Sequence, residues 1–174
     1  MRTELESSLE EFEAAKDEVL RRVAEVDIEK LGERPFEGKW SILEILEHLV
    51  VAEYETFHKL PDYSEVDEMT QSLRNRLMLR IVMFVLGRRI RVKVPAKAME
   101  PKGMMTFETI NERWDENHRW MRGFVDQLSD EELDRMYFAH PVAGPMDLAQ
   151  SIELGRVHLR NHTEQIDKRL EALS

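Results

Sequence analysis

The most regular feature of this chain is a set of apolar positions that repeat at helical spacing. Near the start, apolar residues follow one another at alternating intervals of four and three residues, with Lys16 as the one polar member of the series. Such a repeat places its members on one face of a long helix. We expect this helix to be broken by the segment 31–35, which contains glycine and proline. Its apolar face consists of Leu5, Leu9, Phe12, Val19, Val23 and Val26.

Helix-start signals precede further apolar faces. Ser41 and Glu44 have the spacing of a capping box and stand directly before an apolar run, which predicts a second helix from about residue 41. Pro61 is expected to end that helix. Thr106 is a favourable N-cap residue for a third helix, whose inner face would include Trp114.

The last long helix is predicted to begin after Asp147, with Gln150 completing the cap. A short helical piece is expected at Ser129 and Glu132, followed by an irregular segment over 140–145. No run of alternating apolar and polar residues predicts a β-strand. The expected fold class is therefore all-α: a four-helix bundle with additional short helices, formed by a single domain over residues 1–174.

Composition narrows the possible functions. The chain has no cysteine, so that any metal must be bound by histidine and carboxylate side chains. The net charge of −10 argues against a nucleic-acid partner. The first residues are acidic and mixed, without the basic and apolar pattern of a signal peptide, and we expect a cytoplasmic protein.

The charge is distributed unevenly. Between Glu68 and Glu100 there are eight basic residues and no acidic one, and within this stretch nine of the ten residues of 77–86 are apolar. As a helix this run is about 15 Å long, half of the roughly 30 Å of a bilayer core, so that no transmembrane segment is expected. It predicts a buried or partner-facing helix that ends near Gly87. The alternative is a basic amphipathic helix that lies on an anionic membrane.

Three histidines form a candidate metal site. His158 and His162 lie four residues apart on one face of the last predicted helix, and two imidazoles at that spacing can converge on one divalent ion. His48 on the second predicted helix offers a third imidazole, which would give an open site with positions for water or substrate. The alternative for such a pair is an ordinary core or surface histidine. Gly155, one turn before His158, suggests that another group approaches the helix backbone closely.

For the other polar residues the sequence gives less specific predictions. His58 is predicted to be exposed and His118 to be packed in the core, whereas His140 lies in a loop that could reach the mouth of the site. Ser151 is expected to serve packing rather than nucleophilic catalysis. No strong general base or catalytic triad can be recognised, so that catalytic residues stay unassigned. Three acids that flank His48 are expected on a solvated helix face, with a role beside the metal as the alternative: Glu44, Glu47 and Glu53.

Two motifs together resemble the DinB-like superfamily. One is the Trp40-Ser41 helix start with a histidine seven residues after the serine, and the other is the spacing H-x3-H-x2-Q that ends at Gln165. The resemblance implies a four-helix bundle of up-down-down-up order, commonly dimeric, that binds a divalent metal through His48, His158 and His162. Gln165 would be a polar neighbour of that metal. Some members of the superfamily are thiol S-transferases or isomerases that use bacillithiol or mycothiol.

These observations leave two classes of function. The first is a metal-dependent thiol S-transferase, or a related hydrolase, that acts on a small molecule with the help of a low-molecular-weight thiol. Zinc or nickel is the expected metal, with iron, manganese or copper as further candidates, because neutral imidazoles suit several divalent ions. The second is a non-catalytic bundle that binds a ligand, a membrane or a partner through the basic apolar segment 71–97. A homodimer with a hydrophobic interface is also expected, because the apolar run 77–86 and the first-helix face together offer more apolar surface than one small bundle must bury.

Overall fold

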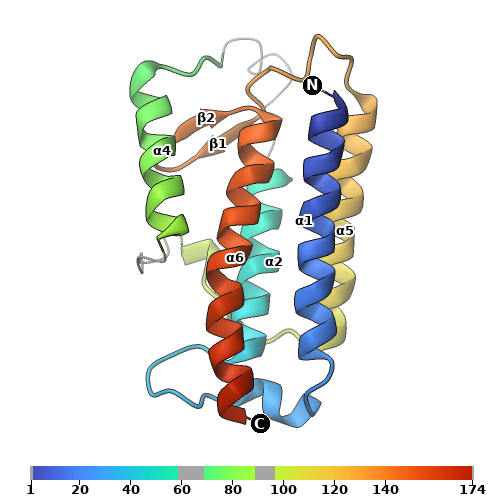
Figure 1. Ribbon diagram of the computed structural model, residues 1–174, viewed down its shortest axis with the longest axis vertical. Helices are drawn as coiled ribbons and strands as arrows, with labels where there is room; N and C mark the ends of the chain where they lie inside the picture. Colours follow the sequence, from blue (N-terminus) through green and yellow to red (C-terminus); the bar gives the residue numbers. More distant parts are fainter. Residues whose placement is uncertain (1, 59–68, 89–96, 174) are drawn as a thin grey trace.

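Four long helices run side by side along the length of the molecule (Figure 1). The computed structural model describes residues 2–58, 69–88 and 97–173. Helix α1 packs mainly against α6, and α2 mainly against α5, with α2 also contacting α6. The four helices are α1 (Arg2–Val23), α2 (Ile42–Phe57), α5 (Phe107–Gln127) and α6 (Leu148–Leu173).

The helix directions give the order of a DinB-like bundle. Helices α1 and α6 run in one direction, and α2 and α5 run in the other (Figure 1). A further helix, α4 (Leu73–Gly87), lies outside the four and packs against α6. It takes the chain back along the bundle, so that α5 can start at the same end as α2. Two short 3₁₀ helices, η1 (Ile28–Gly32) and η2 (Lys97–Met99), complete the all-α architecture that the sequence predicts.

The predicted helix starts are confirmed. Ser41 and Glu44 form the capping box at the start of α2. The Thr106 side chain accepts a hydrogen bond from the Thr109 amide at the start of α5. Asp147 accepts from the Gln150 amide at the start of α6. These signals are local, because each satisfies an amide that the first helical turn leaves without a partner.

A small β-hairpin precedes α6, where the sequence predicted an irregular segment and no strand. Strands β1 (Phe138–His140) and β2 (Gly144–Met146) are antiparallel, with Phe138 opposite Met146. Strands of three residues are too short to show an alternating pattern. Gly144 has a φ of +76°, and an added Cβ would lie 2.2 Å from Asn75 of α4, so that both its conformation and its surroundings favour glycine. The piece at Ser129–Glu132, predicted to be helical, is a turn.

The apolar run of α4 is only partly buried, whereas the sequence predicted a helix that is either buried or faces a partner. Leu79 is buried, whereas Leu77, Ile81 and Phe84 are exposed on the outer side. A single helix at the edge of the bundle has one neighbouring face, and its other side therefore faces solvent. The helix ends at Gly87 as predicted, whereas the predicted end of the second helix at Pro61 lies outside the described residues. Within the described ranges, no helix is long and apolar enough to cross a membrane.

Gly155 allows α1 and α6 to pack closely, as its position predicted. A Cβ at this residue would lie 2.8 Å from two ring carbons of the buried Phe12.

We expect Gly155→Ala to reduce the free energy of unfolding by about 1–3 kcal/mol, because overpacking of this ring outweighs the better helix propensity of alanine. Urea unfolding measures the change. The matched variant is Gly123→Ala on α5, where nothing lies within 4 Å of the added methyl group. It should stabilise the protein by about 0.5–1 kcal/mol, and equal effects of the two variants would contradict the argument.

Candidate metal centre

Three imidazoles meet between α2 and α6. One ring nitrogen from each of His48, His158 and His162 lies within 4.8 Å of the others. Nε2 of His48 and Nε2 of His158 are 3.3 Å apart. Two nitrogens on one zinc ion are roughly 3.3 Å apart, because each bond is about 2.0–2.1 Å long. The cluster therefore has dimensions that fit a single divalent ion, and the expected convergence of these histidines is observed.

The neighbours of the cluster orient two of the rings. Nδ1 of His48 donates a hydrogen bond of 2.6 Å to the Met99 carbonyl. This bond leaves Nε2 of the neutral ring unprotonated and directed at the cluster. The amide nitrogen of Gln165 lies 3.3 Å from Nδ1 of His162, which is the neighbouring position that the resemblance implies.

Burial keeps the three imidazoles neutral. Desolvation is the main cause that lowers the pKa of His158 to about 3, and repulsion from His48 and His140 adds to it. The pKa of His162 lies well below its usual value, first through desolvation and then through its two neighbours in the cluster. Desolvation also lowers the pKa of His48. At neutral pH all three rings therefore keep an electron pair available for a metal.

Glu47 anchors the segment that supports His48. Its carboxylate accepts hydrogen bonds from the backbone amides of Lys102, Gly103 and Met104, at 2.8–3.2 Å. Glu47 is buried, so that its predicted place on a solvated face was wrong. The segment that covers it is more than fifty residues away in sequence, and the helix pattern contains no sign of it.

We expect Glu47→Gln to weaken divalent metal binding about tenfold, within the roughly 10–100-fold range for groups that support metal ligands. The neutral amide can accept fewer of the three hydrogen bonds, so that the Met99 carbonyl is held less firmly against His48. Competition with a chromogenic chelator measures the affinity. Glu55→Gln, a half-buried position on the same helix, is the control. Unchanged affinity in Glu47→Gln would show that this segment does not support the cluster.

A cavity of about 720 Å³ opens beside the histidines. Its walls come from α2, α4, α6, the loop before α2 and the hairpin, and the surface that they expose to the cavity is largely apolar. His140 also lines this wall, and it is the last residue of strand β1 rather than the loop residue that the sequence predicted. Cavities of this size, largely apolar with a few convergent polar groups, are typical of small-molecule sites.

The cavity wall also includes the carboxylate of Glu53, which the sequence wrongly placed on a solvated helix face. Glu53 is buried, and its Oε2 lies 3.3 Å from Nε2 of His118. On the other side of that ring, Nδ1 is 3.9 Å from Oε1 of Glu13. His118 is packed in the core, as predicted. No sequence signal joins these residues, because they come from three helices that are distant in sequence.

Two further predictions about polar residues were wrong. His58 is half-buried rather than exposed, and its ring lies between Tyr54 and Trp120, at 4.5 Å from each ring centroid. Glu44 is buried rather than solvated, because it serves both the capping box and an ion pair with Arg34. Ser151 donates to the Asp147 carbonyl, as expected of a packing residue.

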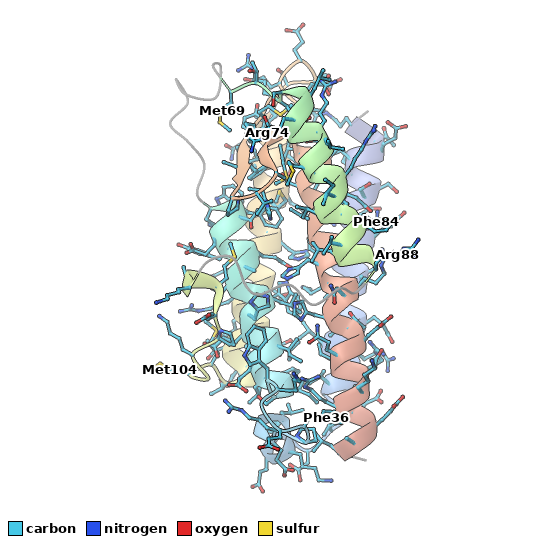
Figure 2. The ribbon with its side chains drawn as sticks, turned by 90° about the vertical axis from the view of Figure 1, so that its left-hand side faces the viewer. Phe36, Met69, Arg74, Phe84, Arg88 and Met104 are labelled. Carbon is cyan, nitrogen blue, oxygen red and sulfur yellow. The ribbon has the colours of Figure 1, made fainter. Side chains whose placement is uncertain are left out.

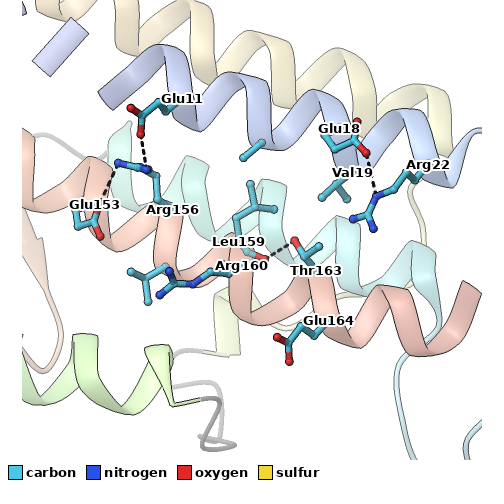
Figure 3. Close-up of a pocket in the computed structure, with 12 residues that line it drawn as sticks. Glu11, Glu18, Val19, Arg22, Glu153, Arg156, Leu159, Arg160, Thr163 and Glu164 are labelled. Carbon is cyan, nitrogen blue, oxygen red and sulfur yellow. Dashed lines mark hydrogen bonds and ion pairs between the residues drawn. The ribbon is translucent and has the colours of Figure 1, made fainter. Parts of the chain in front are cut away.

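A second cavity of about 440 Å³ lies between α1 and α6 (Figure 3). Several of its charged side chains form ion pairs: Arg156 pairs with Glu11 and Glu153, and Nε of Arg22 lies 3.6 Å from Oε1 of Glu18. The residues that line this cavity include no convergent set of metal ligands. The histidine cavity is therefore the better candidate site.

The comparison with protein families agrees with the fold. The family described as the DinB superfamily matches residues 11–166, which include all three histidines of the cluster. The chain therefore belongs to the DinB superfamily. Searches of curated proteins and of solved structures found no significant match.

Proposed function

We propose that this protein is a metal-dependent enzyme that transfers a low-molecular-weight thiol to a small electrophilic molecule, with hydrolysis of a small molecule as the related alternative. The observation that carries the proposal is the convergence of three neutral imidazoles on the wall of a largely apolar cavity. Bacillithiol and mycothiol, which the resemblance to the superfamily suggests, are the thiols to examine first.

His48, His158 and His162 would hold the metal. A divalent cation at this position supplies a charge that lowers the pKa of a coordinated thiol or water, so that the thiolate or hydroxide forms at neutral pH. The Met99 carbonyl keeps His48 in the tautomer that binds through Nε2. The apolar walls exclude water from the thiol and the electrophile, and a lower dielectric strengthens the electrostatic interactions between them.

Glu53 is the chain's own candidate for accepting the thiol proton. The carboxylate lies on the cavity wall, and its Oε2 is 3.3 Å from Nε2 of the buried His118. The sulfur then forms a bond to the electrophilic atom. The electrophile either releases its leaving group or, in an addition, takes the proton back.

The proposal is tested by the consumption of an electrophile by the purified protein. Turnover should require both a divalent metal and a thiol, and it should stop when a chelator removes the metal. Equal turnover by the metal-free protein would overturn the proposed enzyme, whereas turnover with metal and without thiol would favour the hydrolase.

The second candidate is a non-catalytic binding protein. The observation that favours it is the outer side of α4, where four large apolar side chains are exposed. Binding of a ligand or partner would then be unaffected by His158→Ala, whereas the enzymatic activity of the first candidate would be lost.

A homodimer stays a prediction, with less surface available for it than the sequence suggested. The apolar face of α1 is buried inside the bundle against α5 and α6. Of the two apolar surfaces on which the prediction rests, only the outer side of α4 is therefore available.

A further inference from the structure

The outer side of α4 carries a continuous apolar stripe, which we call the α4 stripe. Its members are spaced four, four and three residues apart, so that they share one face of the helix. The distance from first to last is about 16 Å along the helix axis. Its four members are large and apolar, yet a substantial fraction of each residue is exposed to solvent: Leu73 82%, Leu77 59%, Ile81 44% and Phe84 56%.

Arginines border the α4 stripe. Arg74, Arg76, Arg80 and Arg88 are exposed, and the guanidinium of Arg88 lies 4.9 Å from the centre of the Phe84 ring. Figure 2 shows Arg74 and Arg88 toward the two ends of α4, with Phe84 between them. Among the described residues none of these four forms an ion pair, and the sequence has no acidic residue between Glu68 and Glu100. Elsewhere on the surface, arginines such as Arg122 and Arg156 are paired with glutamates.

This combination fits a lipid surface better than a second copy of the chain. A large apolar side chain has a surface on the order of 200 Å², so that the exposed fractions of the four stripe side chains amount to roughly 400–500 Å². Each partner of a stable protein–protein interface contributes about 800 Å², which is more than the stripe offers. A symmetric dimer through this stripe would also bring together the arginines of both copies, for which the described part of the chain supplies no carboxylate partner. An anionic membrane accepts a narrow convex stripe into its headgroup region and neutralises the arginines beside it.

We propose that the α4 stripe and its arginines dock this protein on the surface of an anionic membrane. This inference does not depend on the proposed chemistry, because α4 contributes none of the three histidines. Ile81 belongs to the stripe and also lines the histidine cavity. Docking would therefore place the cavity beside the lipid, where ligands with an apolar part are concentrated.

Co-sedimentation of the full-length protein with vesicles tests the proposal. The protein should bind phosphatidylcholine–phosphatidylglycerol vesicles and not pure phosphatidylcholine, and binding should weaken as salt is raised. Leu77→Ser with Phe84→Ser should lower the partition constant more than tenfold, because the apolar contribution of both side chains is lost. Each of Arg74→Gln, Arg80→Gln and Arg88→Gln should lower it about fivefold.

The controls change exposed residues of the same kinds outside α4. Ile28→Ser and Arg119→Gln should bind the anionic vesicles as the wild type does, because these residues lie on η1 and α5. Circular dichroism checks that each variant is folded. Failure to bind anionic vesicles would overturn the proposal, as would equal loss in the control variants. A dimer in sedimentation that dissociates on Leu77→Ser with Phe84→Ser, without vesicle binding by the wild type, would assign the stripe to an interface between copies instead.

Discussion

The His158→Ala and His162→Ala proteins are expected to contain no stoichiometric divalent metal, whereas the wild type is expected to bind one ion per chain. Each substitution removes one of three imidazoles whose nitrogens lie within 4.8 Å of one another. Even groups that only support metal ligands change affinity by roughly 10–100-fold, so that the loss of a ligand should exceed about 100-fold. Metal analysis after reconstitution and desalting under identical conditions measures the result.

His58→Ala is the control for this experiment. His58 follows His48 by ten residues and is also partly buried, but its ring is packed between Tyr54 and Trp120. Its loss should leave one ion per chain. Equal metal content in the three variants and the wild type would refute the assignment of the cluster, whatever the activity of the protein.

The second expected result concerns the thiol. With cobalt in place of the native metal, the addition of a low-molecular-weight thiol should produce a sulfur-to-metal charge-transfer band at neutral pH. The reason is that a divalent cation stabilises the thiolate over the thiol, which at an ordinary pKa of about 8.5 is mostly protonated. The band should be absent in His158→Ala, and an electrophile should be consumed only when metal and thiol are both present.

This measurement separates the two classes of function. An oxygen analogue of the thiol, in which a hydroxyl replaces the sulfur, is the matched control and should give no such band. A protein that binds cobalt and shows neither a band nor turnover with any of several thiols would contradict the transferase. Vesicle binding through the α4 stripe would be unaffected by that outcome, because the stripe lies on the outer side of another helix.

The sequence predicted the fold well because its determinants are local and repetitive. Apolar spacing indicated the helices, and short-range caps such as Ser41 with Glu44 located their starts. The hairpin was missed because three-residue strands contain too few positions to show a period. The order of the helices came from resemblance, since the apolar spacing of a helix does not record its direction relative to its neighbours.

The candidate site was predictable to a similar extent. His158 and His162 share a helix, so that their spacing alone suggests one ion. His48 could be added from its place in the motif, and the structure shows its ring against theirs. The partner of His48 could not be predicted, because the Met99 carbonyl belongs to η2, about fifty residues away in sequence. The same limit applies to Glu47 and Glu53, which a helical pattern alone places in solvent.

The sequence by itself determined the helix class, the helix starts, the histidine pair and the segregation of basic charge between Glu68 and Glu100. Each of these depends on residues within a few turns of one another. Only the tertiary structure decided which acids are buried and where the cavity opens. It also decided that the apolar face of α1 is buried in the bundle, whereas the α4 stripe is exposed to solvent. The physical reason is that a side chain is buried only when a neighbouring element packs against it. An apolar helix face in the sequence indicates that such a contact would be favourable. Whether another helix of the same chain makes the contact depends on how the helices pack.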